Sequence, residues 1–190
     1  MNKLCILVCI LLPFLSRAQS KPNALAVELN AWMAKPAGVR EIAPFKVVAE
    51  DPASVKDVLG ATYFQLEPQE LAKIWDQHNG VYRIKVPYAG RFLNLMLFET
   101  TQNDVSIDGP TGSFYGIDPG KSFRGILEGD ETSVVGISFF RNGDIYGIVS
   151  DESRGNIVIG QLKNQPKNAT ATYVVYEEQK LQIGHPFTCF

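Results

Sequence analysis

The residue types that most often carry out chemistry are sparse in this chain of 190 residues. Neither His78 nor His185 belongs to a metal-binding pair such as His-Glu-x-x-His. The sequence has no Gly-x-Ser-x-Gly elbow around a nucleophilic serine, and no glycine-rich phosphate loop that ends in Lys-Ser or Lys-Thr. We therefore expect that this chain is not an enzyme by itself.

Cys189 is the side chain whose chemistry needs an explanation. Cys5 and Cys9 lie in the apolar N-terminal run, so an exported chain that loses this run keeps only Cys189 and cannot form an internal disulfide. In an oxidising compartment, an unpaired thiol pairs with another chain, lies inert in a core, or acts as a reactive or metal-binding group. On the residues alone, all three roles stay open.

The N-terminus has the parts of a secretory signal peptide, which we predict to span residues 1–18. Lys3 supplies a basic start, and the apolar run Leu4–Leu15 is too short to cross a bilayer. Small residues then precede the expected cleavage site between Ala18 and Gln19. The product would be secreted, either extracellular or periplasmic, and an uncleaved anchor is the alternative. No second long apolar run follows, so we expect no membrane contact after cleavage.

The composition limits the class of partner. A hydrophobic share of 45% beside a charged share of 20% is the balance of an ordinary globular protein. Lys and Arg number 18 against 20 Asp and Glu, which gives a formal charge of -2. Binding to a phosphate backbone draws on a basic excess that is missing here, so nucleic acid is not an expected partner.

The hydrophobic pattern predicts an α+β fold that is predominantly antiparallel β. We expect meander-like or sandwich-like sheets, with two or three short helices in the N-terminal half. The front part, to about residue 103, would contain helices over 23–35, 51–59 and 68–79 and strands over 45–48, 61–66, 81–86 and 91–99. Asn79-Gly80 would end the last of these helices, and Pro87-Tyr88-Ala89-Gly90 would form the turn of a hairpin.

The C-terminal half has the pattern of an antiparallel meander over residues 122–181. Short β-prone runs cover 123–127, 134–140, 145–149, 157–159 and 172–176. Asn142-Gly143 predicts a two-residue type I′ turn, in which both residues have positive φ. Residues 104–121 would be a loop and residues 182–190 a C-terminal arm. We expect one domain, residues 19–190, in which two sheets pack over one core.

Several segments of this meander resemble a known family. The segments Phe123–Gly129, Ser133–Ser138, Tyr146–Ile148 and Tyr173–Tyr176 look like the propeptide of reprolysin-type (ADAM-like) zinc metalloproteases. The positions that match the family pattern are Gly125, Gly129, Ser133, Ser138, Gly147 and Tyr173. Pro186, Phe187, Thr188 and Cys189 fall where that family has a Pro-x-x-Cys segment. The resemblance covers about residues 121–190.

The resemblance implies that this chain is the pro-region of a secreted zinc metalloprotease zymogen. Such a pro-region assists folding and keeps the protease latent by a cysteine switch, in which Cys189 would bind the catalytic zinc and Pro186, Phe187 and Thr188 would form the switch arm. The zinc and the catalytic domain, which is the expected partner in cis, would lie downstream, and no cofactor is expected in this chain. Two alternatives stay open: a secreted β-sandwich binding or adhesion module, and a stand-alone protease inhibitor.

Overall fold

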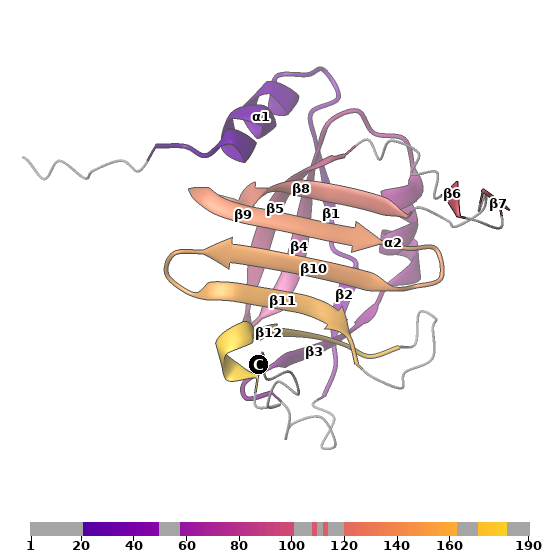
Figure 1. Cartoon of the computed structure of the whole chain (residues 1–190), viewed down its shortest axis with the longest axis vertical. Helices are drawn as coiled ribbons and strands as arrows, with labels where there is room; N and C mark the ends of the chain where they lie inside the picture. Colours follow the sequence, from indigo (N-terminus) through magenta and orange to yellow (C-terminus); the bar gives the residue numbers. More distant parts are fainter. Residues whose placement is uncertain are drawn as a thin grey trace, which may run out of the picture.

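The computed structural model describes residues 21–49, 58–100, 108–109, 112–113, 120–162 and 171–181, and its main feature is a ten-stranded sheet (Figure 1). The strands are β1 (Val39–Ile42), β2 (Phe45–Val47), β3 (Thr62–Leu66), β4 (Val81–Tyr88), β5 (Arg91–Glu99), β6 (Asp108–Gly109), β7 (Gly112–Ser113), β8 (Lys121–Leu127), β9 (Asp130–Phe139), β10 (Ile145–Asp151), β11 (Gly155–Gln161) and β12 (Tyr173–Glu177). The helices are α1 (Ala24–Met33), α2 (Pro68–Trp75) and the 3-10 turn η1 (Glu178–Lys180). The order across the large sheet is β1-β4-β5-β8-β9-β10-β11-β12-β3-β2, and β6 and β7 form a separate pair.

The predicted α+β, predominantly antiparallel fold is confirmed. Among the described strand pairs only β1 and β4 run parallel. The strands form one curled sheet instead of two stacked ones, because β2, β3 and β12 fold back to contact β4. Inward-facing side chains from both halves therefore share a single core, whose largest members include Phe64, Tyr82, Phe123, Phe139 and Tyr173.

The predicted meander is confirmed as β8 to β12, and the expected front strands appear as β2, β3, β4 and β5. Strand β1 was not predicted, since its sequence Val-Arg-Glu-Ile is short and half charged. The expected loop over residues 104–121 contains β6 and β7, and β8 already begins at Lys121. Of the helical turn expected at 51–59, residues 51–57 lie outside the described residues, and Val58 forms an isolated β-bridge with Leu181.

Helix α1 covers part of the outer surface of the sheet (Figure 1). Asn23 begins it: its Oδ1 accepts the amide of Ala26 at 2.9 Å, and its Nδ2 donates to the carbonyl of Ser133 on β9 at 2.7 Å. The apolar side of the helix packs on outward residues of β4, β5 and β8 to form a second core, Ala26, Leu29, Val81, Met96, Phe98 and Ile126. As predicted, this helix lies within 23–35; its buried residues are Ala26 and Leu29, whereas the apolar Val27 and Met33 are exposed.

Helix α2 begins at Pro68 as predicted, but it ends earlier than expected. The helix stops at Trp75, because Asp76 has an extended backbone with ψ 145. Gly80 therefore does not cap the helix. Instead it lets β1 approach, since a Cβ on Gly80 would lie 2.3 Å from the carbonyl oxygen of Gly38. Ile74 is fully buried in the main core, with Leu71 and Trp75 packed beside it.

Two predicted turns have a different geometry. The β4–β5 turn consists of Ala89 (φ 49) and Gly90 (φ 75) alone, because Pro87 and Tyr88 still pair with Phe92 and Arg91. Between β9 and β10, Gly143 has φ 90, but Ala89 is the one non-glycine residue with positive φ in the described ranges, so Asn142 does not fit a type I′ turn. The side chain of Asn142 accepts the amide of Asp144 at 3.0 Å instead, which stabilises a longer turn.

Candidate functional site

The six family-like positions lie on β8, β9, β10, β12 and the β8–β9 turn, whereas the predicted switch lies elsewhere. Cys189, with Pro186, Phe187 and Thr188, falls outside the described residues, and so does the predicted cleavage site at Ala18 and Gln19. The structure therefore locates the six positions in the sheet, and the role of Cys189 as a zinc ligand stays a prediction.

The two family-like glycines of the β8–β9 hairpin have backbone roles. Gly125 lies where β8 passes close to β5: a Cβ there would be 2.0 Å from the carbonyl oxygen of Met96. Gly129 has φ 82 in the turn, a conformation that other residues rarely adopt. Both positions need glycine because of the fold, and no chemistry is required to explain them.

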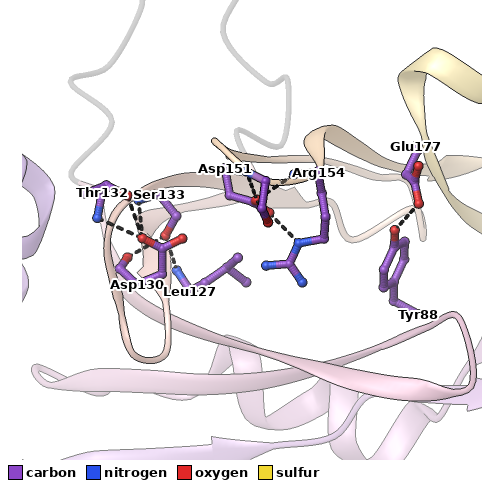
Figure 2. Close-up of polar contacts among 9 residues, drawn as sticks. Tyr88, Leu127, Asp130, Thr132, Ser133, Asp151, Arg154 and Glu177 are labelled. Atoms are coloured by element: carbon purple, nitrogen blue, oxygen red, sulfur yellow. Dashed lines mark hydrogen bonds and ion pairs between the residues drawn. The ribbon is translucent and has the colours of Figure 1, made fainter. Parts of the chain in front are cut away.

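Ser133 and Ser138 use their hydroxyl groups to join strands. The buried Ser133 Oγ accepts the amide of Leu127 at 2.8 Å and donates to the carbonyl of Asp130 at 2.7 Å (Figure 2). Ser138 Oγ lies 2.8 Å from Ser122 Oγ on β8. Each hydroxyl already has a partner within the sheet, and neither has a histidine base beside it among these contacts, so their roles here are structural.

Gly147 and Tyr173 belong to the packing of the core. A Cβ on Gly147 would lie 3.1 Å from Ile137 Cγ1, closer than side chains normally approach. The ring of Tyr173 stacks on Phe64 with centroids 5.6 Å apart, and its hydroxyl donates to the carbonyl of Gly143. Burial, with a contribution from Asp144, raises the pKa of Tyr173 to about 12, so this hydroxyl stays protonated at neutral pH.

The chain leaves the described fold at Leu181, directly after η1. Leu181 pairs with Val58 in an isolated antiparallel bridge, and the amide of Leu59 donates to the carbonyl of Lys180 at 3.3 Å. Cys189 follows Leu181 by eight residues. We call the end of η1 at Leu181 the exit, because the predicted C-terminal arm follows it in the sequence.

Polar contacts tie the end of β12 to β4 and to η1. The hydroxyl of Tyr88 donates to Glu177 Oε1, which also accepts from Lys180 Nζ at 2.9 Å (Figure 2). These hydrogen bonds, from Tyr88 first and Lys180 second, hold the pKa of Glu177 below its usual value. Burial and the bond to Glu177 raise the pKa of Tyr88 to about 12. At neutral pH the pair is therefore a phenol bonded to a carboxylate.

The turn between β10 and β11 lies beside this contact. Asp151 is buried, and its Oδ1 accepts the amides of Ser153 at 2.8 Å and Arg154 at 2.9 Å. Its Oδ2 accepts from Arg154 Nε at 2.6 Å (Figure 2). Burial alone would raise the pKa of Asp151, but the hydrogen bonds from Ser153 and Arg154 outweigh it and lower the pKa below the usual value. We call Tyr88, Asp151, Arg154, Glu177 and Lys180 the exit cluster.

Histidine and acidic residues do not assemble into a metal site in the part of the chain that the structure describes. No group of three or more His, Cys, Asp or Glu side chains is placed there to hold a metal ion. His78 lies in the loop between α2 and β4, with Nε2 3.2 Å from the carbonyl oxygen of Val81, and its ring packs edge-to-face with Tyr82. Across the same ranges, no helix is both long and apolar enough to cross a membrane.

Comparisons with known proteins give no further assignment: no family model, no curated protein and no solved structure matches this chain.

Sequence reasoning missed the exit cluster. Tyr88 was expected in a turn, and Asp151, Arg154 and Glu177 lie far apart in the chain, so their approach depends on how the sheet curls. A local signal existed for one part only. The spacing Asp151-x-Ser153-Arg154 is typical of an Asp that accepts the backbone amides of a turn.

Proposed function

We propose that this chain is the pro-region of an exported zinc metalloprotease precursor and that Cys189 keeps the protease latent by binding its catalytic zinc. One observation carries the proposal. The family-like positions occur in the family's order along β8, the β8–β9 turn, β9, β10 and β12, and a Pro-x-x-Cys segment follows shortly after the last of these strands.

The position of the exit supports this role. The eight residues from 182 to 189 can extend over about 26 Å, which is enough to enter the cleft of an adjoining domain. The exit cluster fixes the segment just before this arm, Glu177 and η1, to the sheet through Tyr88 and Lys180. A rigid base would lower the entropy that the arm loses when it binds, and so would favour binding.

The chemistry of zinc explains why a cysteine would silence the enzyme. A catalytic zinc keeps one position open for water, and a thiolate in that position excludes the water. The described residues include no ligand set of their own for zinc, so its other ligands would come from the catalytic domain. Tethering makes a modest affinity sufficient: at an effective concentration of about 1 mM, a ligand with a dissociation constant of about 1 µM is almost fully bound.

Proteolytic activity of the full-length precursor and its variants tests this proposal. We expect a His-Glu-x-x-His motif downstream of Phe190, and a parent precursor that does not cleave casein. Cys189→Ser should cleave casein without prior processing, whereas the control Thr188→Ala should stay latent. In the cobalt-substituted parent, the thiolate should add a charge-transfer absorption band that Cys189→Ser lacks. A Cys189→Ser precursor as latent as the parent would remove Cys189 from this role.

A further inference from the structure

The outer surface of the curled sheet has two apolar areas, and α1 covers only one of them. Met96, Phe98 and Ile126 are buried under this helix. The second area lies on β9, β10 and β11, which are in front of β4 and β5 in Figure 1. Here Tyr146 is 58% exposed, Val134 45% and Ile148 44%. No described element covers these three side chains.

This second area is uncharged, which is unusual for a solvated sheet face. The outward positions between Val134 and Gly160 on these strands alternate with core residues, and six of them are apolar or glycine: Val134, Gly136, Tyr146, Ile148, Val158 and Gly160. The remaining outward positions are serine or asparagine. We call the six residues the uncharged face. A solvated antiparallel face normally alternates core residues with polar ones, so this composition indicates a contact surface.

The outer surface of β4 shows the normal pattern. On β4 the outward side chains Arg83 and Lys85 form ion pairs with Glu128 and Glu41. The lack of charge on the uncharged face is therefore a local feature of β9 to β11.

The centre of the uncharged face is Ile148. It lies opposite Gly136 on β9 and Val158 on β11. A Cβ added to Gly136 or Gly160 would meet no atom within 4 Å, so both glycines leave open space next to the larger side chains. Ile148 and Tyr146 thus stand above small neighbours, which gives a partner both apolar anchors and shallow gaps to fill.

We propose that the uncharged face docks the protease domain to which the C-terminal arm leads; this inference rests on the proposed function. The position of the exit argues for this occupant. Asn156 Nδ2 on β11 donates to Glu178 Oε2 in η1 at 2.7 Å, so η1, which comes just before the arm in the sequence, lies beside one strand of the face. Three strands span about 10 Å at the usual spacing of 4.8 Å, whereas the arm reaches about 26 Å.

The C-terminal arm and the uncharged face would have different roles in holding the protease domain. The arm brings the domain to a local concentration near the millimolar range, so that a small apolar contact suffices to hold it. The uncharged face would then fix the orientation in which Cys189 approaches the zinc. Docking on this face does not require the zinc-thiolate bond, and this makes the two contacts separable by mutation.

The test uses the full precursor, cut at the junction after Phe190, and measures the dissociation constant between the two parts. Ile148→Lys should weaken the complex by about tenfold to a hundredfold, because it places a charge at the centre of the contact. Ile148→Thr keeps a β-branched side chain and should give a smaller loss in the same direction. Val27→Lys is the matched control, since Val27 is also an exposed apolar residue, at 61%, that belongs to α1 and not to the face. All three variants should keep the melting temperature of the parent.

The same measurements in a Cys189→Ser background separate the two proposals. If Cys189→Ser leaves latency unchanged while Ile148→Lys still weakens the complex, docking stands and the zinc-ligand role fails. If Cys189→Ser activates the protease while Ile148→Lys binds like Val27→Lys, docking on this face is wrong. Light scattering tests whether a second copy of the chain binds the face instead. A parent dimer that Ile148→Lys dissociates would assign the face to that second copy and overturn the proposal.

Discussion

Among the described glycines, Gly125 is the one at which an added Cβ would lie closest to another atom. Its Cβ would lie 2.0 Å from the carbonyl oxygen of Met96 and 3.0 Å from Cα of Leu97, and both of these are backbone atoms. Backbone cannot yield without breaking the pairing between β5 and β8. Gly125→Ala should therefore lower the free energy of unfolding by roughly 3 kcal/mol, the upper end of the cost of overpacking. Urea denaturation measures this change.

Gly136→Ala is the control for this prediction. Gly136 lies on the neighbouring strand, opposite Arg124, and a Cβ there would meet no atom within 4 Å. Its substitution should change the free energy of unfolding by no more than about 0.5 kcal/mol. Equal losses in the two variants would mean that the close approach of β5 to β8 does not explain Gly125.

At the scale of an element, the turn between β10 and β11 depends on one carboxylate. Asp151 accepts hydrogen bonds from Ser153 and Arg154, and its side chain is 1% exposed. Asp151→Asn keeps the shape but removes the charge, and should lower the free energy of unfolding at pH 7 by about 2 kcal/mol. Glu152→Gln in the same turn is the control, because Glu152 is exposed.

The effect of Asp151→Asn should depend on pH in one direction. The pKa of Asp151 in the folded protein lies below its ordinary value of 3.8, so the charged carboxylate stabilises the fold fully above that value. This stabilisation is lost as the pH falls through the folded pKa. The difference between parent and Asp151→Asn should therefore be constant from pH 7 to about pH 5 and shrink below pH 4. A difference that grew with acidity would contradict the assignment.

The elements that could be predicted from the sequence are those with a local signal. The alternation in β8 to β12 and the helical spacing of apolar residues in α1 depend on neighbouring residues, and both elements were predicted within a few positions. Strand β1 could not be predicted, because its four residues pair with β4, which follows about 40 positions later. A turn was correctly predicted at Asn142-Gly143, but its type I′ geometry was wrong, because the side chain of Asn142 bonds to Asp144 and favours a different backbone.

At the scale of the whole molecule, the candidate site depends on how the sheet closes. The residues of the exit cluster come from β4, the β10–β11 turn, β12 and η1, and only the curl of the sheet brings Tyr88 to Glu177. Periodicity predicts which residues face inward along one strand, but it does not say which distant strands meet. The uncharged face was missed for a related reason, since its members become one surface only when the registers of three strands are known.

Residues 19–190 should fold without the rest of a precursor, because one curled sheet encloses the main core. Residues 19–190 form a chain of 172 residues, long enough to bury roughly 70% of the surface that the unfolded chain exposes. Six of the nine strand pairs in the large sheet join strands that follow one another in the chain, which keeps the loops to be closed short for those pairs. We expect a monomer with a far-UV circular dichroism spectrum dominated by β structure.

This domain should also be indifferent to reducing agents. Only Cys189 remains after removal of residues 1–18, so no disulfide within the chain can contribute to its stability. The melting temperature should be the same with and without dithiothreitol, and unfolding should be a single transition because the main core is shared by both halves of the sheet. A helical spectrum, a random-coil spectrum, or two separate transitions would contradict the single curled sheet, since each would mean that part of the chain does not share its core.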